Sequence, residues 1–166
     1  MKETVYTPEQ VEKLSGDAAR RAMEHYKHGL NCAECVLQAF LDLGISDYDP
    51  SIVGLVSGMG GGMGHTGYTC GAVNAGLVVV SAEKGRKNPY AASTPKERIA
   101  ELNAPETGVY ARHGAYLREC FAQLGSIECR DLCIQYRDFW GRDRAKNCQR
   151  IIGLCAAAAV RHALKG

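Results

Sequence analysis

Four of the eight cysteines in this chain follow sequence signals for the first turn of a helix, which is where a thiol becomes reactive. They are Cys32, Cys70, Cys129 and Cys148. Good N-cap residues accompany them, namely Asn31, Thr69, Asn147 and, three positions ahead of Cys129, Ser126. Free N–H groups and the positive end of a helix dipole stabilise a thiolate. The sequence therefore predicts lowered thiol pKa values, and redox or metal chemistry, at these four positions.

Thiol/disulfide exchange requires an attacking thiolate and a second thiol that can approach it. Cys32 and Cys35 have the Cys-x-x-Cys spacing of dithiol oxidoreductases, with Cys32 at a helix start and Cys35 one turn later. The alternative for Cys35 is an ordinary buried thiol beside Val36. The sequence leaves both interpretations open.

The same four cysteines are also suited to hold an iron–sulfur cluster, or, less favoured, zinc. Backbone N–H groups at helix starts would then hydrogen-bond the sulfurs. The spacing of the four matches no short ferredoxin run, so the fold must bring them together. A zinc site made of two short cysteine pairs is a weaker alternative, and its ligands would be Cys32, Cys35, Cys129 and Cys133.

The remaining cysteines lie in apolar contexts, and we expect them to pack in the core. They are Cys120, Cys133 and Cys155.

A glycine-rich loop, residues 58–67, precedes Cys70. Backbone without side chains can approach a bound group closely, so we expect its N–H groups to face an anion, a sulfur atom or a substrate. The candidate binding positions are Gly60, Gly61, Gly62 and Gly71. His65 in this loop is a candidate base or metal ligand, with simple solvent exposure as the alternative.

Composition indicates one soluble globular domain covering residues 1–166, with 46% hydrophobic and 23% charged residues. We expect a cytoplasmic protein, because the start of the chain has no export signal and the apolar runs are too short to span a membrane. In a reducing compartment, eight cysteines favour metal binding, catalysis or core packing over structural disulfides. A net charge of +2 gives no general reason to expect nucleic acid or a membrane as partner.

One basic segment, residues 137–150, surrounds Phe139 and Trp140 and has the composition of a surface that grips a polyanion. Asp138 and Asp143 interrupt its positive charge. This favours a solvated, internally paired surface.

Helix start and stop signals punctuate the chain and predict a mostly α-helical single-domain bundle of about five to seven helices with a glycine-rich loop. Capping boxes begin at Thr7 and Asn31, and Thr94 followed by Pro95 repeats the start signal. The expected helices cover residues 8–27, 32–43, 95–104, 109–124 and 148–164, with a short segment at 52–56.

A further helix is expected to begin after Thr69, although residues 77–80 would also suit a strand. Its small residues would let another backbone approach closely, and they permit a homodimer. They are Gly71, Ala72, Ala75 and Gly76.

Four segments, in order, resemble the C_GCAxxG_C_C family of redox-active proteins, which carry four cysteines and a Cys-Gly-Ala-x-x-Gly box. The matching segments are residues 31–34, 58–64 with 69–73, 125–132 and 147–148. The chain departs from the box at its last position, where it has Ala75 in place of glycine and Gly76 follows.

The resemblance implies redox activity at Cys32, Cys70, Cys129 and Cys148. Similar sequence is joined to haem- and cluster-bearing segments in split-Soret cytochromes, which favours electron transfer. Selenocysteine in some relatives favours thiol chemistry instead. The chain has no Cys-x-x-Cys-His, so covalent c-type haem is set aside.

Our first hypothesis is a small redox-active protein in which Cys70 or Cys32 attacks and another of the four cysteines resolves. The glycine loop would admit a redox partner protein or a small-molecule substrate. Such a protein would be a thiol-dependent oxidoreductase or an electron carrier. The alternatives are an iron–sulfur or zinc protein without catalysis of its own, and an interaction module whose cysteines are merely buried.

Overall fold

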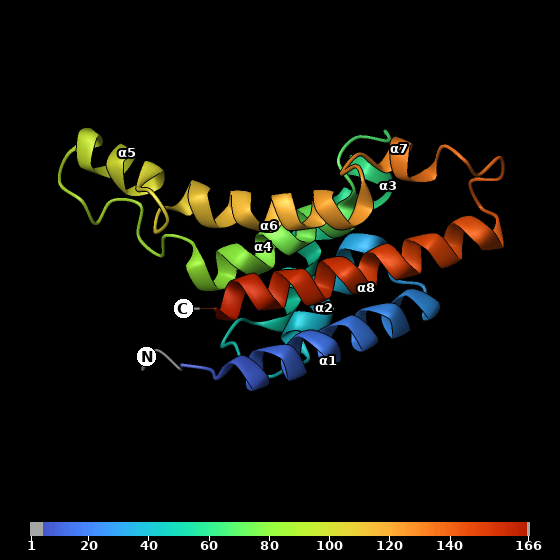
Figure 1. Ribbon diagram of the computed structural model, residues 1–166, viewed down its shortest axis with the longest axis horizontal. Coiled ribbons are helices and arrows are strands. Elements are labelled where there is room, and N and C mark those ends of the chain that lie inside the picture. The colour runs from blue at the N-terminus through green and yellow to red at the C-terminus, as the bar shows by residue number, and fades with distance from the viewer. Residues whose placement is uncertain (1–4, 166) are drawn as a thin grey trace.

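The chain folds as a bundle of helices around one long helix, α8 (Arg142–Leu164). This computed structural model describes residues 5–165. The helices that pack against α8 are α1 (Pro8–Lys27), α2 (Cys32–Leu41), α4 (Gly71–Lys84) and α6 (Val109–Leu124). Figure 1 shows the two short elements α3 (Gly60–Met63) and α7 (Cys129–Cys133) together at one end of the bundle, and α5 (Pro95–Asn103) at the other.

The predicted mostly α-helical fold is confirmed. Residues 5–165 contain no β-strand, and an isolated bridge between Thr69 and Glu128 is the nearest approach to one. Residues 77–80 lie inside α4, so the strand alternative for them is wrong. The expected segment at 52–56 belongs to a longer 3₁₀ helix, η1 (Pro50–Met59). No helix in the described part of the chain is long and apolar enough to cross a membrane.

Side-chain caps fix the helix starts that the sequence marked most clearly. The predicted capping boxes at Thr7, Asn31 and Thr94 are all formed. In each box the cap side chain accepts a hydrogen bond from the backbone N–H of the third helical residue, and the side chain of that residue accepts one from the N–H of the cap. Gly125 ends α6 in the left-handed conformation expected of a C-terminal glycine. These local rules therefore positioned α1, α2, α5 and α6 correctly.

Two predicted helix starts are wrong. Helix α8 begins at Arg142, so Cys148 lies in its second turn and not at its start. The Asn147 amide, expected to cap, donates instead to the carbonyl of Leu132 at 3.1 Å. At the start of α4, Cys70 and not Thr69 occupies the N-cap position, and its side chain forms no capping hydrogen bond.

The core lies where α2, α4 and α8 meet, and its largest fully buried side chains include Phe40, Tyr116, Ile151 and Ile152. Burying one such side chain contributes about 1.5–3 kcal/mol to stability. The small residues of α4 face this core: Gly71, Ala72, Ala75 and Gly76 are all buried within the chain. They bring α4 close to its neighbours, so this face is not available to a second copy.

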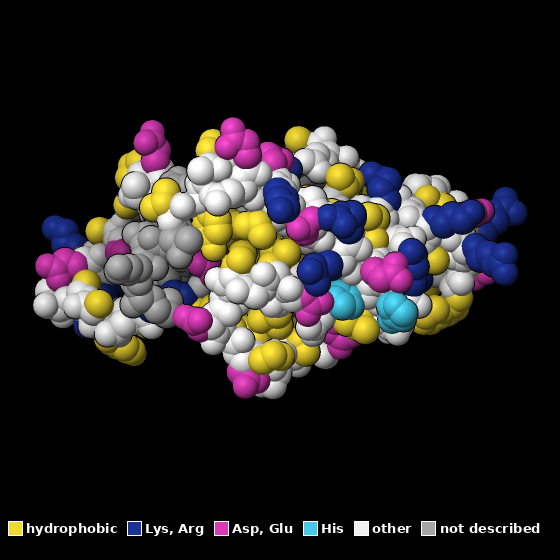
Figure 2. All heavy atoms as spheres, turned by 90° about the horizontal axis from the view of Figure 1, so that it is seen from below, with side chains coloured by type: hydrophobic (Ala, Val, Ile, Leu, Met, Phe, Trp, Pro, Cys, Tyr) yellow, Lys and Arg dark blue, Asp and Glu magenta, His cyan; other side chains and the backbone are white. Residues whose placement is uncertain are grey.

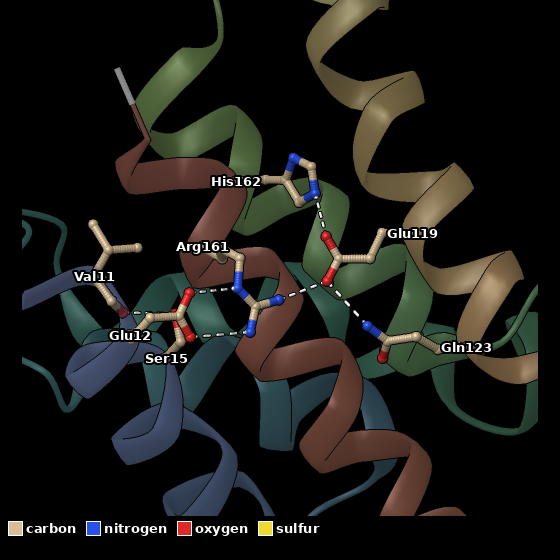
Figure 3. A network of polar contacts seen from close by, with 7 residues as sticks. All are labelled: Val11, Glu12, Ser15, Glu119, Gln123, Arg161 and His162. Atoms are coloured by element: carbon tan, nitrogen blue, oxygen red, sulfur yellow. Dashed lines mark hydrogen bonds and ion pairs between the residues drawn. The ribbon is translucent and has the colours of Figure 1, made fainter. Parts of the chain in front are cut away.

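A polar network ties three helices together at the far end of α8 from the short elements (Figures 1 and 3). The Arg161 guanidinium donates to Glu119 of α6 at 2.6 Å and to Glu12 of α1 at 3.0 Å. The other carboxylate oxygen of Glu119 lies 2.7 Å from Nε2 of His162. The network thus links α1, α6 and α8 through the Arg161 guanidinium.

We expect Glu119→Gln to lower the free energy of unfolding by about 1–3 kcal/mol, because the half-buried Arg161 and His162 both lose their charged partner. Glu12→Gln is the matched control. Its side chain is 62% exposed, so its replacement should change the free energy of unfolding much less than Glu119→Gln does. Urea unfolding of both variants measures the difference, and equal effects would contradict this account of the network.

Candidate functional site

Five cysteines line one pocket of about 240 Å³ at the end of the bundle where α3 and α7 lie. They come from four elements that are distant in sequence: Cys32 from α2, Cys70 from the start of α4, Cys129 and Cys133 from α7, and Cys148 from α8. All four cysteines selected from the sequence are among them. A volume of this size holds many water molecules, so the pocket has room for a small ligand.

The capping box of α2 holds Cys32 at the pocket. The Asn31 side chain accepts hydrogen bonds from the N–H groups of Ala33 and Glu34, at 2.9 and 3.1 Å. Its own amide donates to the carbonyl of Ser57 in η1, and the Ser57 hydroxyl donates to Glu34 at 2.6 Å. Because these bonds join the start of α2 to η1, they fix Cys32, which is half-buried, at the first position of its helix.

Cys70 lies close to Cys32 because Gly71 has no side chain. A β-carbon on Gly71 would lie 2.8 Å from Sγ of Cys32 and would also meet the backbone of Met59. The N–H of Cys70 donates to the carbonyl of Ile127 at 2.8 Å, which ties the start of α4 to the segment that precedes α7. Glycine at position 71 is therefore what lets the starts of α2 and α4 meet.

The glycine loop forms a left-handed turn beside the pocket. Five consecutive residues, 61–65, have φ between 63° and 74°, so the segment α3 is not an ordinary right-handed helix. Met63 and His65 adopt this conformation at a cost of about 1–2 kcal/mol each. The Thr66 hydroxyl donates to the carbonyls of Gly62 and Met63, at 2.7 and 2.9 Å, and helps to hold the turn.

The loop also positions α7. The N–H of Cys129 donates to the carbonyl of Tyr68 at 2.8 Å, and the N–H of Arg130 donates to that of Gly67 at 2.9 Å. Gly60 and Gly61 line the pocket, whereas Gly62 and Gly71 lie against Cys129 and Cys32 respectively. The loop thus forms part of the pocket wall, and it also packs against the pocket cysteine Cys129.

Burial raises the pKa of three pocket thiols, Cys70, Cys129 and Cys148. Burial, followed by repulsion from the Cys133 thiolate, raises the pKa of Cys129 and of Cys148 to about 12. Burial and the charge of Cys32 raise the pKa of Cys70, against the opposing hydrogen bonds from the N–H groups of Val73 and Ala72. The predicted lowering of the pKa is wrong for these three. At Cys70 and Cys129 the desolvation of a thiolate outweighs what the helix ends supply, and Cys148 lies beyond the first turn of its helix.

Cys35 does not face the pocket. It is buried, its Sγ lies 3.5 Å from the carbonyl of Leu30, and burial raises its pKa to about 12. The zinc site built on Cys32, Cys35, Cys129 and Cys133 is therefore not assembled. Among residues 5–165, no three histidine, cysteine or acidic side chains are arranged to hold a metal ion.

Cys120 and Cys155 are buried between α6 and α8, as the sequence predicts for core thiols. Hydrogen bonds from Cys155 and Tyr116 lower the pKa of Cys120, and the same contact with Cys120 raises that of Cys155. Solvent reaches 2% or less of either side chain.

Two parts of the pocket were not predicted from the sequence. Cys133, expected in the core, lies beside Cys129 and Cys148 on the pocket wall. The spacing of Cys129 and Cys133, one helical turn apart, was the available signal. The basic segment 137–150 contributes Phe139, Trp140 and Arg144, so it is part of the pocket and not only a solvated surface.

His65 is exposed at the pocket, with its ring centroid 5.7 Å from those of Phe139 and Trp140.

We expect the reduced protein to lose stability as the pH rises above about 8.5, the ordinary pKa of a cysteine in an unfolded chain. Between that pH and the folded-state pKa of about 12, the unfolded chain has released a proton that folded Cys35 retains. Each such thiol therefore lowers the free energy of unfolding by up to about 1.4 kcal/mol per pH unit. Thermal unfolding in reductant at about pH 8 and pH 10 measures the loss. Cys35→Ala should show a smaller loss, and an equal slope in both proteins would contradict the assignment.

We expect Gly62→Ala to lower the free energy of unfolding by more than about 3 kcal/mol and to expose Cys129 to alkylation. The added carbon would lie 2.6 Å from the carbonyl oxygen of Tyr68 and 2.7 Å from Cβ of Cys129, at φ 74°. Gly64→Ala is the matched control, because it shares the left-handed backbone but has nothing closer than 3.9 Å. It should lose only about 1–2 kcal/mol. Urea unfolding and peptide-mapped alkylation test the pair, and similar losses would show that Gly62 is not closely packed.

Comparison with known proteins gives one match. Residues 30–162 match the model of the family described as "Putative redox-active protein (C_GCAxxG_C_C)". No curated protein and no solved structure matches the chain. The matched range contains every cysteine of the pocket, the glycine loop and α4. Since the family model covers most of the chain, the protein belongs to the C_GCAxxG_C_C family of redox-active proteins.

Proposed function

We propose that the protein is a thiol/disulfide oxidoreductase whose pocket cysteines alternate between dithiol and disulfide. The observation that carries the proposal is the convergence of five cysteines from four distant elements on one pocket. Cysteines needed only for packing would be distributed through the core, as Cys120 and Cys155 are. Free thiols are maintained in a reducing compartment, so we place the protein in the cytoplasm. We treat residues 1–166 as one redox domain.

Cys32 is the attacking cysteine in this proposal, and Cys70 resolves. Cys32 is half-buried and reaches the pocket from the first position of α2, whereas Cys70, Cys129 and Cys133 are buried. Its Sγ lies against Gly71, directly beside Cys70, and the Cys32 thiolate raises the pKa of Cys70 more than any other charge. These contacts favour Cys32 and Cys70 as the pair that forms the disulfide.

The reaction proceeds in two exchange steps. The Cys32 thiolate attacks one sulfur of a substrate disulfide, RSSR, so that a mixed disulfide forms and one RS⁻ leaves. Cys70 then gives up its proton and attacks Sγ of Cys32, so that a Cys32–Cys70 disulfide forms and the second RS⁻ leaves. In total the protein loses two electrons and two protons, and RSSR becomes two RSH.

The test is to add one equivalent of a small disulfide to the reduced native protein and to map the products by mass spectrometry. We expect two thiols released per chain and a Cys32–Cys70 disulfide as the main product. If native protein releases no thiol, and all eight cysteines react only after denaturant is added, the alternative of an interaction module with buried cysteines replaces this proposal.

An iron–sulfur protein is the second candidate, and the donor set of the pocket favours it. Five thiols with no acidic side chain among the lining residues match the ligand preference of iron–sulfur clusters. Cys32, Cys70, Cys129 and Cys148 would be the ligands, and such a cluster would supply one-electron transfer. A single zinc ion fits less well, because no three donors are arranged to hold one in residues 5–165. Visible absorption of protein purified without oxygen, bleached by dithionite, would establish the cluster and displace the first proposal.

A further inference from the structure

One arginine inside the pocket has no negative partner. The Arg144 guanidinium lies over the ring of Phe139 at 4.1 Å and near that of Trp140 at 6.0 Å. Its Nη1 lies 3.6 Å from Sγ of Cys148. Its Nε is buried and donates to no acceptor in the structure. The side chain is therefore held in place by aromatic stacking while part of its hydrogen-bonding capacity is unused.

The surroundings of Arg144 leave its charge unneutralised. No aspartate or glutamate lines the pocket, and no carboxylate of residues 5–165 lies within ion-pair distance of Arg144. Its nearest acidic neighbour in sequence, Asp143, is exposed and faces Lys146 at 3.9 Å instead. A buried donor without a partner, on a fixed cation beside a cavity of about 240 Å³, is suited to a negative group.

We propose that the pocket takes a small disulfide or thiol that carries a negative group, and that Arg144 binds this group between Phe139 and Trp140. The inference rests on the proposed function and specifies its substrate class. Arg144 suits a planar carboxylate because its N–H groups form a fork that can bind both oxygens. Its contact with Cys148 places the bound group beside that cysteine, and Cys32 lines the same pocket.

The outer surface agrees with this charge preference. Figure 2 shows lysine and arginine side chains gathered at the end of the molecule where α8 begins. A groove between α1 and α8 is bordered by Arg20, Lys27, Lys146 and Arg150, of which the first three also face Asp17, Glu24 and Asp143. Basic side chains at the end that contains the pocket favour the approach of anions, and added salt is expected to weaken this effect.

The experiment compares two aromatic disulfides of similar size on the full reduced protein. Dithiobis-nitrobenzoate carries two carboxylates, and dithiodipyridine is neutral at the working pH. For each protein, the rate with the anionic reagent is divided by the rate with the neutral one, which removes differences in intrinsic reactivity when proteins are compared. Arg144→Gln should lower this ratio by about tenfold or more, because a charge-assisted hydrogen bond is lost. Arg142→Gln, an exposed arginine at the start of the same helix, should lower it far less, because it removes only one of several positive charges at that end and no contact in the pocket.

Added salt should lower the ratio in the unmodified protein, which provides a test that does not depend on how the variants fold. An unchanged ratio in Arg144→Gln, or equal losses with both reagents, would overturn the inference, since Arg144 would then only support the pocket. If the unmodified protein still reacts with dithiodipyridine, the proposed thiol/disulfide function stands although the role of Arg144 does not. If neither reagent reacts, both the proposed function and this inference fail.

Discussion

Replacing Cys32 with serine should reduce the rate of thiol release from a small disulfide by about a hundredfold or more. Serine is close to cysteine in size, so the capping box at Asn31 and the packing against Gly71 should persist. Its hydroxyl does not attack a disulfide under these conditions. Stopped-flow measurement of the first released thiol, at protein concentrations in excess of the disulfide, determines this rate.

Two further variants decide whether Cys32 is special. Cys148 is the other half-buried cysteine of the pocket, so Cys148→Ser is matched in exposure and should retain the first step. Cys70→Ser should also retain the first release but should accumulate the mixed disulfide, which intact mass spectrometry detects. If the rate falls in Cys148→Ser and not in Cys32→Ser, Cys148 is the attacking cysteine and our assignment is wrong.

Replacing Gly76 with alanine should lower the free energy of unfolding by about 4 kcal/mol or more, enough to unfold many domains of this size. A β-carbon on Gly76 would overlap the hydroxyl and ring of Tyr116. Tyr116 is fully buried, and its hydroxyl donates to the carbonyl of Val73 at 3.1 Å. The ring has no space to move into, so α4 and α6 must separate. Urea unfolding, or loss of expression as soluble protein, measures the effect.

Gly16→Ala is the control for this prediction. Gly16 lies in the middle of α1, and no heavy atom lies within 4 Å of its added carbon. Alanine forms helix more readily than glycine, so this variant should gain about 0.5–1 kcal/mol. A Gly76→Ala protein as stable as the unmodified one would contradict the contact between α4 and α6.

Helix boundaries followed from the sequence where the signal was local and had no competitor. At Thr7, Asn31 and Thr94 the cap and its reciprocal partner lie three residues apart, so the two satisfy each other without help from the fold. At Asn147 a distant acceptor, the carbonyl of Leu132, took the side chain, and the helix had already begun at Arg142. A sequence window does not contain that acceptor, because it is supplied by tertiary packing.

The features of the site likewise fall into those that local sequence determines and those that tertiary packing determines. The choice of Cys32, Cys70, Cys129 and Cys148 came from local patterns and family resemblance, and all four line the pocket. The pKa values of Cys70, Cys129 and Cys148 did not follow, because burial depends on how many other elements close around each thiol. Arg144 belongs to the basic segment 137–150, for which the sequence favoured an internally paired surface. Only the three-dimensional neighbours reveal that no carboxylate pairs with Arg144.

The wide separation of the pocket cysteines along the chain has a consequence for how the protein is made. Cys32 and Cys148 lie near opposite ends of the sequence, and they share a pocket only after α2 and α8 have packed. Eight cysteines can pair in about 105 complete ways. If a nascent chain is oxidised before it has folded, most of these pairings join cysteines that lie far apart in the folded bundle. Such disulfides prevent the chain from reaching the native fold. The timing of the first oxidation, relative to folding, decides whether a newly synthesised chain becomes a redox protein or a trapped misfolded one.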